Sequence, residues 1–214
     1  MHEEQLEADT NNLFSRVAKK YDSNLFRLYF ERLYTQIIPI VDKHAYEYLH
    51  PDSRVLDIAC GTGEVVFRLA QTYPHVTFVG IDVVPEMVAR AYEKTKLLPN
   101  VEIKAGNVND LPFPKNTFEA VLCSEAFHHF SQPENAIREM HRVMKEHSFL
   151  LLVDLGSAST FITRMFERIS HLVEINKHIY SQGELADLLQ QNGFSIHSIS
   201  HYSLNNFFAC SKEH

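Results

Sequence analysis

Residues 55–63 read VLDIACGTG, an apolar run that passes directly into two glycines separated by one threonine. An apolar run of this length is typical of a strand that is covered on both faces. Gly61 and Gly63 permit a tight turn and let a ligand approach the backbone without a Cβ in the way. A helical pattern begins at Glu64, and its first N–H groups would be open to a ligand. A glycine pair alone also occurs in ordinary β–α turns.

The chain downstream alternates strand-like and helix-like segments. We expect strands at residues 55–59, 77–81, 101–105, 120–124 and 149–154, and helices at residues 64–72, 85–96 and 133–144. This alternation is typical of an α/β protein in which crossover helices connect the strands of a parallel sheet. The expected fold class is therefore a Rossmann-like three-layer sandwich.

The C-terminal part of the chain departs from this alternation. Ser181 and Glu184 have the spacing of a capping box, which predicts a helix over residues 184–191. Two β-like runs follow, at residues 196–202 and 207–211, and predict a terminal antiparallel hairpin.

Two further helical regions, at residues 10–49 and 159–175, are not needed to complete the sheet. Both are rich in apolar and aromatic residues, and we expect them to form a mobile cover over a substrate pocket. The alternatives are ordinary packing against the core and a surface that faces a partner chain or a membrane. We interpret the chain as a single domain, residues 1–214. Its parts are an N-terminal helical cover (1–50), a ligand-binding core (51–154), a lid-like insertion (155–180) and a last helix with the hairpin (181–214).

The second expected strand ends in a carboxylate, Asp82. The C-terminal edge of a doubly wound sheet is where ligands bind, and an acid in this position can accept hydrogen bonds from both hydroxyls of a ribose. The structural alternative is an N-cap for the helix that begins near Pro85, but Asp82 lies slightly too early for that. We therefore predict that Asp82 binds a ribose.

The loop does not match the dinucleotide fingerprint Gly-x-Gly-x-x-Gly. Residues 59–64 read ACGTGE, so the third glycine is missing and Glu64 would lie beside any pyrophosphate. An acidic residue in that place disfavours a nicotinamide-dependent oxidoreductase and favours a ligand without phosphates.

The composition excludes several other classes. The 214 residues carry a formal net charge of −7 and show no basic face, which disfavours nucleic acid as a partner. No apolar run approaches the roughly 20 residues that cross a bilayer, so we expect no integral membrane association. The three cysteines are far apart and form neither a disulfide framework nor a zinc motif. A cytoplasmic protein without a metal and with a small-molecule substrate is the expectation.

Taken together, these motifs resemble a known family. Residues 55–63 are similar to motif I of the class I S-adenosylmethionine-dependent methyltransferases, and Asp82 matches their ribose-binding acid. The resemblance extends over residues 14–154 and includes GNVNDLPFP at 106–114, NTFE at 116–119, FHHF at 127–130 and IREMHRVMK at 137–145. This series is similar to the small-molecule branch that contains the ubiquinone/menaquinone biosynthesis C-methyltransferases. It implies a mostly parallel, seven-stranded sheet with only the last strand antiparallel.

The resemblance also implies roles for individual residues around S-adenosylmethionine. Asp57 would lie near the methionine amino group, with the backbone of Ala59, Cys60, Gly61 and Gly63 along the methionine side. The nucleoside would be held by Asp82, Val83, Met87, Asn107 and Val108, with Met87 packed on adenine and Asn107 at the adenine amino group. Ser124 and Glu125 would form the floor near the methyl group, and Tyr21 would close the pocket.

Three departures from the family pattern stand out. Ala59 replaces a glycine, which should be tolerated if its φ angle is negative. Asn107 stands where this branch usually has Asp, and its side-chain oxygen can still accept a hydrogen bond. The turn expected at residues 145–148 reads KEHS and lacks the usual glycines.

Methyl transfer from a sulfonium needs mainly alignment of the acceptor and exclusion of water. An acceptor with a proton to lose also needs a base, and His128 and His129 are the candidates because histidine titrates near neutral pH. The alternative is that one of them packs structurally and the other faces solvent. A non-catalytic S-adenosylmethionine-binding protein remains a second reading of the same motifs. The sequence leaves the oligomeric state open, with a homodimer among the alternatives, and does not identify the acceptor.

Overall fold

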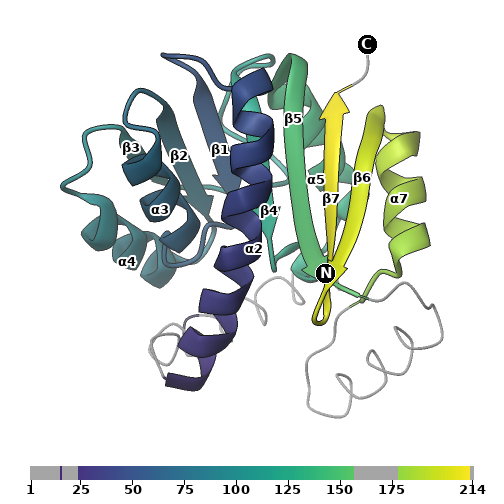
Figure 1. Ribbon diagram of the computed structural model, residues 1–214, viewed down its shortest axis with the longest axis horizontal. Helices are drawn as coiled ribbons and strands as arrows, with labels where there is room; N and C mark the ends of the chain where they lie inside the picture. The colour runs from purple at the N-terminus through teal and green to yellow at the C-terminus, as the bar shows by residue number, and fades with distance from the viewer. Residues whose placement is uncertain (1–14, 16–23, 157–177, 213–214) are drawn as a thin grey trace.

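The computed structural model describes residues 15, 24–156 and 178–212 (Figure 1). Its centre is one seven-stranded sheet in the order β3-β2-β1-β4-β5-β7-β6. The strands are β1 (Arg54–Ile58), β2 (Thr77–Asp82), β3 (Val101–Ala105), β4 (Phe118–Ser124), β5 (Met144–Leu155), β6 (Phe194–Tyr202) and β7 (Asn205–Lys212). Strands β1 to β5 pair in parallel, whereas β7 runs antiparallel to both β5 and β6. The predicted sheet and terminal hairpin are confirmed.

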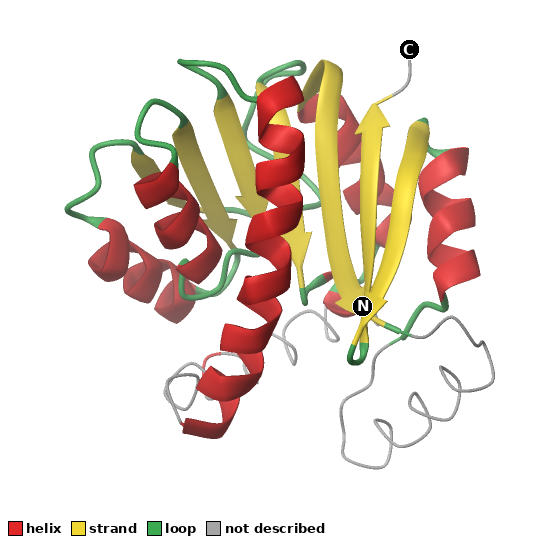
Figure 2. Cartoon of the chain, viewed as in Figure 1, coloured by secondary structure: helices red, strands yellow, loops and turns green. Residues whose placement is uncertain are grey.

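Helices cover both faces of this sheet (Figure 2). They are α2 (Asn24–Tyr48), α3 (Glu64–Thr72), α4 (Pro85–Thr95), α5 (Pro133–Val143) and α7 (Gln182–Gln191), with a short 3₁₀ turn η1 (Phe127–His129) after β4. Because side chains alternate across a strand, neighbouring residues of β5 contribute to opposite layers of the core. Leu150 and Leu152 pack on the side of α5 and α7, whereas Leu151 and Val153 pack on the side of α2 and α3.

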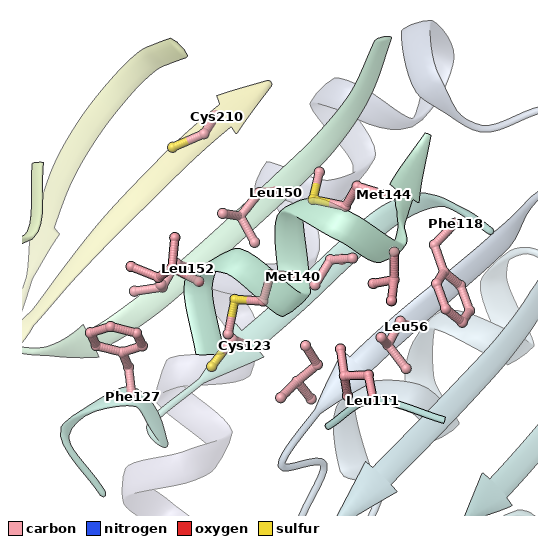
Figure 3. Close-up of a cluster of buried hydrophobic side chains, with 14 of the residues drawn as sticks. Leu56, Leu111, Phe118, Cys123, Phe127, Met140, Met144, Leu150, Leu152 and Cys210 are labelled. Atoms are coloured by element: carbon pink, nitrogen blue, oxygen red, sulfur yellow. The ribbon is translucent and has the colours of Figure 1, made fainter. Parts of the chain in front are cut away.

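The layer between the sheet and α5 is a dense apolar cluster (Figure 3). Met140 of α5 lies over Cys123 of β4 and Leu152 of β5, and all three are completely buried. The apolar runs that predicted strands covered on both faces are therefore explained by two helical layers. Cys123 and Cys210 are buried free thiols, and burial raises the pKa of both thiols.

Most element boundaries agree with the sequence prediction, and α3 and β3 agree at both ends. The main correction concerns residues 145–148, which were expected to form a turn. They belong to the start of β5, where Phe118 pairs with Met144 before the register shifts, and His147 has a positive φ of 54°. The Lys212 ammonium also donates to the Met144 carbonyl at 2.9 Å. A bulged strand therefore takes the place of the turn that was expected at residues 145–148.

Helix α2 comes from the N-terminal region that the sequence placed outside the sheet. Leu33, Ile37, Val41 and Ala45 recur every four residues and are buried against the sheet. The Tyr73 hydroxyl donates to Asp42 at 2.5 Å and ties this helix to the end of α3. The predicted lid-like insertion at 155–180 falls largely outside the described residues. Among the helices that the structure describes, none is long and apolar enough to cross a membrane.

Candidate cofactor site

The site lies where the direction of strand addition reverses. Strand β1 pairs with β2 on one side and with β4 on the other. Strand β3 is added beyond β2, whereas β5 is added beyond β4, on the opposite side of β1. In open α/β sheets, ligands bind beyond the carboxyl ends of the strands at such a switch point. A cavity opens there and extends from α2 to η1. Its lining comprises Leu33, Tyr34, residues 58–62, Val65, residues 81–84, Met87, residues 106–109, residues 124–126 and residues 129–131.

The glycine turn forms one wall of the cavity and opens α3, as predicted. Gly61 has a φ of 54° and Gly63 a φ of 74°, so both use backbone conformations that favour glycine. The two glycines have different surroundings. A Cβ on Gly61 would meet nothing within 4 Å, whereas a Cβ on Gly63 would lie 2.9 Å from the Ala91 Cβ of α4. Gly61 therefore keeps the cavity wall free of side chains, and Gly63 lets α4 pack closely.

Ala59 departs from the expectation stated for it. Its φ is +53°, in the left-handed region, so the condition of a negative φ is wrong. An L-residue in this region costs about 1–2 kcal/mol relative to its ordinary conformations. The strain lies directly at the cavity, whose lining includes Ala59 and the half-buried Cys60.

Asp82 connects the glycine turn to the start of α4. The Gly61 N–H donates to Oδ2 of Asp82 and the Val84 N–H donates to Oδ1, each at 2.9 Å. The side chain thus organises the backbone before the helix, but the alternative that Asp82 caps the helix is wrong, because the N-cap residue is Val84 and no side chain caps the helix. Burial raises the pKa of Asp82, and the backbone hydrogen bonds oppose this shift. Each carboxylate oxygen retains capacity for a further hydrogen bond on the cavity side.

Asp57 lies behind the glycine turn, in β1 beside Gly80 of β2. Its side chain is buried, and within the part of the chain that the structure describes its Oδ1 has no hydrogen-bond partner. Burial, and then the neighbouring charge of Asp82, raises the pKa of Asp57 to about 8. Asp57 does not itself line the cavity, so the structure places it one layer behind the loop.

The other predicted nucleoside contacts gather at the ends of β2 and β3. Val83, Met87, Asn107 and Val108 line the cavity, with Met87 buried and Val83 exposed. The Asn107 Oδ1 accepts a hydrogen bond from the Asn109 N–H at 2.9 Å. Part of the acceptor capacity of this amide therefore stabilises its own turn.

The two histidines that follow β4 have different surroundings. His129 lines the cavity together with Ser124 and Glu125, whereas His128 does not. His128 is buried, and its Nδ1 lies 2.7 Å from Oδ1 of Asp154 at the end of β5. The two imidazole rings have their centroids 4.1 Å apart. One histidine is thus held in the core, and the other is half-buried and lines the cavity.

Asp154 was missed by the sequence reasoning. It is the last residue of the strand expected at 149–154, so it has the same relation to its strand as Asp82 has to β2. That parallel could have drawn attention to it. Tyr21, which was expected to close the pocket, lies outside the described residues.

Charged side chains connect the glycine turn with α2 and α4. The Arg68 guanidinium contacts Glu64 at 2.8 Å and Glu31 of α2 at 2.7 Å, and the Lys94 ammonium contacts Glu64 at 2.6 Å. Burial favours the neutral form of Glu64, but its contacts with Lys94 and Arg68 outweigh this and lower the pKa. An anionic Glu64 at the start of α3 opposes a phosphate there.

The same arginine lies 5.3 Å from the ring centre of Tyr34, which lines the cavity. This contact and the Glu31 ion pair therefore hold the α2 wall of the cavity against the helix that follows the glycine turn. Sequence reasoning did not identify this link, because no local pattern joins Glu31 to Arg68.

The fold and the cavity together define an α/β protein whose cavity is lined by a glycine turn and a strand-end carboxylate. A family model described as "Methyltransferase domain" matches residues 49–193. The chain therefore belongs to this methyltransferase family, and the resemblance to S-adenosylmethionine-dependent enzymes is confirmed.

Individual relatives agree with this assignment. The chain is 25% identical over 224 residues to a ubiquinone/menaquinone biosynthesis C-methyltransferase of Agrobacterium fabrum, covering 90% of this chain and 83% of the relative. It is 38% identical over 106 residues to an uncharacterized methyltransferase of Bacillus subtilis, covering 48% of this chain and 41% of that relative. A solved geranyl diphosphate C-methyltransferase from Streptomyces coelicolor A3(2) shares the fold at 14% identity, with a TM-score of 0.69 over 85% of this chain and 80% of that one.

Proposed function

We propose that this protein transfers a methyl group from S-adenosylmethionine to a small-molecule acceptor and releases S-adenosylhomocysteine. The observation that carries the proposal is the cavity wall made by Gly61 and Asp82, joined by a hydrogen bond of 2.9 Å at the switch point of the sheet. A glycine without a Cβ beside a strand-end carboxylate suits a nucleoside. The glycine turn also lacks the third glycine of the dinucleotide fingerprint, which disfavours the nicotinamide alternative.

The residues around the cavity fit such a cofactor in charge as well as in shape. The buried Asp57 carboxylate has an oxygen without a hydrogen-bond partner among the described residues, and a cation nearby would stabilise its ionised form. S-adenosylmethionine supplies an activated methyl group on a sulfonium and carries an ammonium group. The negative charge of Asp57 would stabilise the ammonium group from behind the glycine turn. Asp82 would accept hydrogen bonds from the ribose hydroxyls.

The nucleoside and methyl ends of the cofactor would then meet different surfaces. Val83, Met87, Asn107 and Val108 would hold the adenine, with Met87 supplying an apolar face. The backbone of residues 59–63 would follow the methionine part. Ser124 and Glu125 would form the floor beside the methyl group, because they end the strand next to β1.

The acceptor would enter between α2 and η1. Tyr34 and Leu33 on one side and Phe130 and His129 on the other give this end of the cavity an apolar, aromatic character. Aromatic faces also stabilise a sulfonium cation. Relatives named as C-methyltransferases of quinone biosynthesis support an apolar ring as the acceptor class. The cover expected from residues 10–49 and 159–180 falls in large part outside the described residues, as does Tyr21.

Within this site the task of the protein is alignment. The chain would hold the acceptor nucleophile in line with the methyl group and exclude water from the cavity. His129 is the side chain placed to accept a proton from the acceptor when one must leave. We also propose that the protein acts in the cytoplasm, since its free, partly or fully buried cysteines suit a reducing compartment.

The proposal is tested by incubating the protein with methyl-labelled S-adenosylmethionine and a deproteinised small-molecule extract. We expect label in a low-molecular-weight product together with an equal amount of S-adenosylhomocysteine. The Asp82→Ala variant is the matched control, because it removes the proposed ribose contact. A protein that binds the cofactor yet labels nothing in extracts from several growth conditions would support the non-catalytic binding alternative instead.

A further inference from the structure

Helix α2 contains a proline, Pro39, that divides it into two halves. A proline has no N–H to donate to the carbonyl four residues before it, here that of Thr35, so the two halves are coupled less tightly than in an uninterrupted helix. The half after Pro39 is tied to the end of α3 by the Tyr73 hydroxyl, which donates to Asp42 at 2.5 Å. The half before Pro39 carries Tyr34, which lines the cavity. The position of this cavity wall therefore depends on the contacts of the first half.

Arg68 of α3 contacts the first half in two ways. Helices α2 and α3 lie on the same face of the sheet (Figure 1). The Arg68 guanidinium donates from Nη2 to Oε1 of Glu31 at 2.7 Å, and it lies over the Tyr34 ring at 5.3 Å from the ring centre. Glu31 and Tyr34 are three positions apart and so share one side of the helix. A planar guanidinium can serve a carboxylate and an aromatic face together, so Arg68 fixes both the helix and the ring.

The same guanidinium is held from the side of the glycine turn. Its Nε donates to Oε1 of Glu64 at 2.8 Å, and the Lys94 ammonium donates to Oε2 of Glu64 at 2.6 Å. Lys94 also donates to the Thr62 hydroxyl at 3.4 Å, and Thr62 lines the cavity between the two glycines of the turn. A continuous series of contacts therefore joins two walls of the cavity, the glycine turn and the first half of α2.

The charges in this series are stable near neutral pH. Burial favours the neutral form of Glu64, but its contacts with Lys94 and Arg68 outweigh this and lower the pKa. Burial likewise opposes the charge of Arg68, but its contacts with Glu64 and Glu31 prevail and raise the pKa. The Arg68 side chain is 33% exposed, so solvent screens its ion pairs only in part. The contact with Tyr34 is thus made by a permanent cation.

We propose that Arg68 is a positioning residue for the methyl acceptor, which it serves by holding the Tyr34 ring in place at the acceptor end of the cavity. Arg68 does not itself line the cavity, so it acts through Tyr34. The acceptor class that this arrangement fits is a molecule with a flat, apolar ring that packs against the tyrosine. This inference rests on the proposed function, because the methyl group defines which end of the cavity receives the acceptor.

The first experiment needs neither acceptor nor cofactor. The chain contains no tryptophan, so Tyr34→Trp introduces a single indole into the cavity wall and keeps an aromatic face for Arg68. Acrylamide quenching and steady-state anisotropy of this indole are measured in the full-length protein. We expect Arg68→Gln to increase the quenching and to lower the anisotropy. Glu31→Gln should act in the same direction, and the two together should be less than additive, since they remove one shared contact.

Arg32→Gln is the matched control, because it removes the same charge at an exposed position of α2 beside Glu31. We expect it to leave the quenching and the anisotropy of the indole unchanged. Glu31→Gln leaves Arg68 paired with Glu64, so it provides the same comparison if Arg68→Gln does not fold. Quenching and anisotropy that respond to neither Arg68→Gln nor Glu31→Gln, or that respond equally to Arg32→Gln, overturn the inference.

The second experiment uses the labelled transfer reaction with the native Tyr34. We expect Arg68→Gln to raise the amount of extract that gives a half-maximal rate roughly two- to fivefold, the equivalent of one cation–π contact. The KM for S-adenosylmethionine should stay within about twofold, because the bond between Gly61 and Asp82 is left intact. A loss of stability alone would not separate the two substrates in this way.

The outcomes distinguish the inference from the function on which it rests. If transfer occurs and Arg68→Gln alters neither KM, or alters only that for S-adenosylmethionine, the inference fails while the proposed function stands. If the indole responds as expected and no extract yields a labelled product, the proposed function fails, and the acceptor role of Arg68 fails with it.

Discussion

The Asp82 carboxylate accepts a hydrogen bond of 2.9 Å from the Gly61 N–H and so joins the C-terminal end of β2 to the glycine turn after β1. A second bond of 2.9 Å, from the Val84 N–H, ties the same carboxylate to the start of α4. One side chain therefore fixes the backbone on both sides of the proposed nucleoside site. Substitutions at this contact should change ligand binding and the geometry of the turn together.

Replacing Asp82 should weaken cofactor binding strongly. Loss of hydrogen bonds to a charged acceptor costs about 1.5–3 kcal/mol, so Asp82→Ala should raise the dissociation constant for S-adenosylhomocysteine roughly 10- to 150-fold. Asp110→Ala, at an exposed residue near the same edge, is the control. If calorimetry finds the dissociation constant of Asp82→Ala within about twofold of the wild type, the ribose assignment is wrong.

The two glycines of the turn should respond differently to alanine. Gly61→Ala places a methyl group toward open space at a φ of 54°, so it should lower cofactor affinity more than stability. Gly63→Ala should mainly lower the melting temperature, because its Cβ would lie 2.9 Å from the Ala91 Cβ. The added substitution Ala91→Gly should restore part of the stability of Gly63→Ala and none of the affinity of Gly61→Ala. Equal losses of affinity and stability in both single variants would contradict this division.

Ala59 supplies a substitution that should stabilise the protein. Its φ of +53° is available to glycine without strain, so Ala59→Gly should raise the free energy of unfolding. We expect a gain of about 0.5–1 kcal/mol, because relief of the strained conformation exceeds the added flexibility of the unfolded chain. Denaturant unfolding measures the change in the free energy of unfolding. Ala70→Gly, in the buried face of α3, is a control that should destabilise the protein. A loss of stability in Ala59→Gly would show that the alanine methyl packs more favourably than we infer.

Asp57 should make stability depend on pH. Its pKa is raised from an ordinary value of 3.8 to about 8 in the folded protein, so between these two pH values the folded state holds a proton that the unfolded state has released. The free energy of unfolding from this group is therefore greatest at acidic pH and falls as the pH rises toward 8. Asp57→Asn should remove this pH dependence. At pH 8 its free energy of unfolding should be at least about 1 kcal/mol higher than that of the wild type.

The same substitution should weaken binding of S-adenosylmethionine, since it removes the negative charge that we propose stabilises the ammonium group from behind the glycine turn. Stability and affinity thus change in opposite directions, which separates a functional carboxylate from a structural one. Denaturant unfolding at pH 5 and pH 8 tests the predicted change in stability, and calorimetry at pH 8 tests the predicted change in affinity. An Asp57→Asn variant that is destabilised at pH 8 would contradict the raised pKa.

The sequence alone sufficed for the sheet and for the part of the site that depends on strand ends. The apolar runs, the spacing of the helices and the capping box at Ser181 are local features, and the structure agrees with each of them. Asp82 could be identified because a carboxylate after a strand lies at a known edge of the sheet.

Features that depend on packing between distant residues could not be predicted in this way. Ala59 has a positive φ at the start of the turn whose Gly61 N–H is bonded to the distant Asp82, and a sequence does not state φ angles. The pairing of His128 with Asp154 joins residues that are 26 positions apart, and it decides which of two adjacent histidines reaches the cavity. The start of β5 was misjudged because a bulged strand replaces the expected turn.

Titration calorimetry with S-adenosylhomocysteine and with NADH tests the central claim most directly. We predict saturable binding of one S-adenosylhomocysteine per chain, no binding of NADH, and a large loss of S-adenosylhomocysteine affinity in Asp82→Ala. Binding of NADH without binding of S-adenosylhomocysteine would contradict the account.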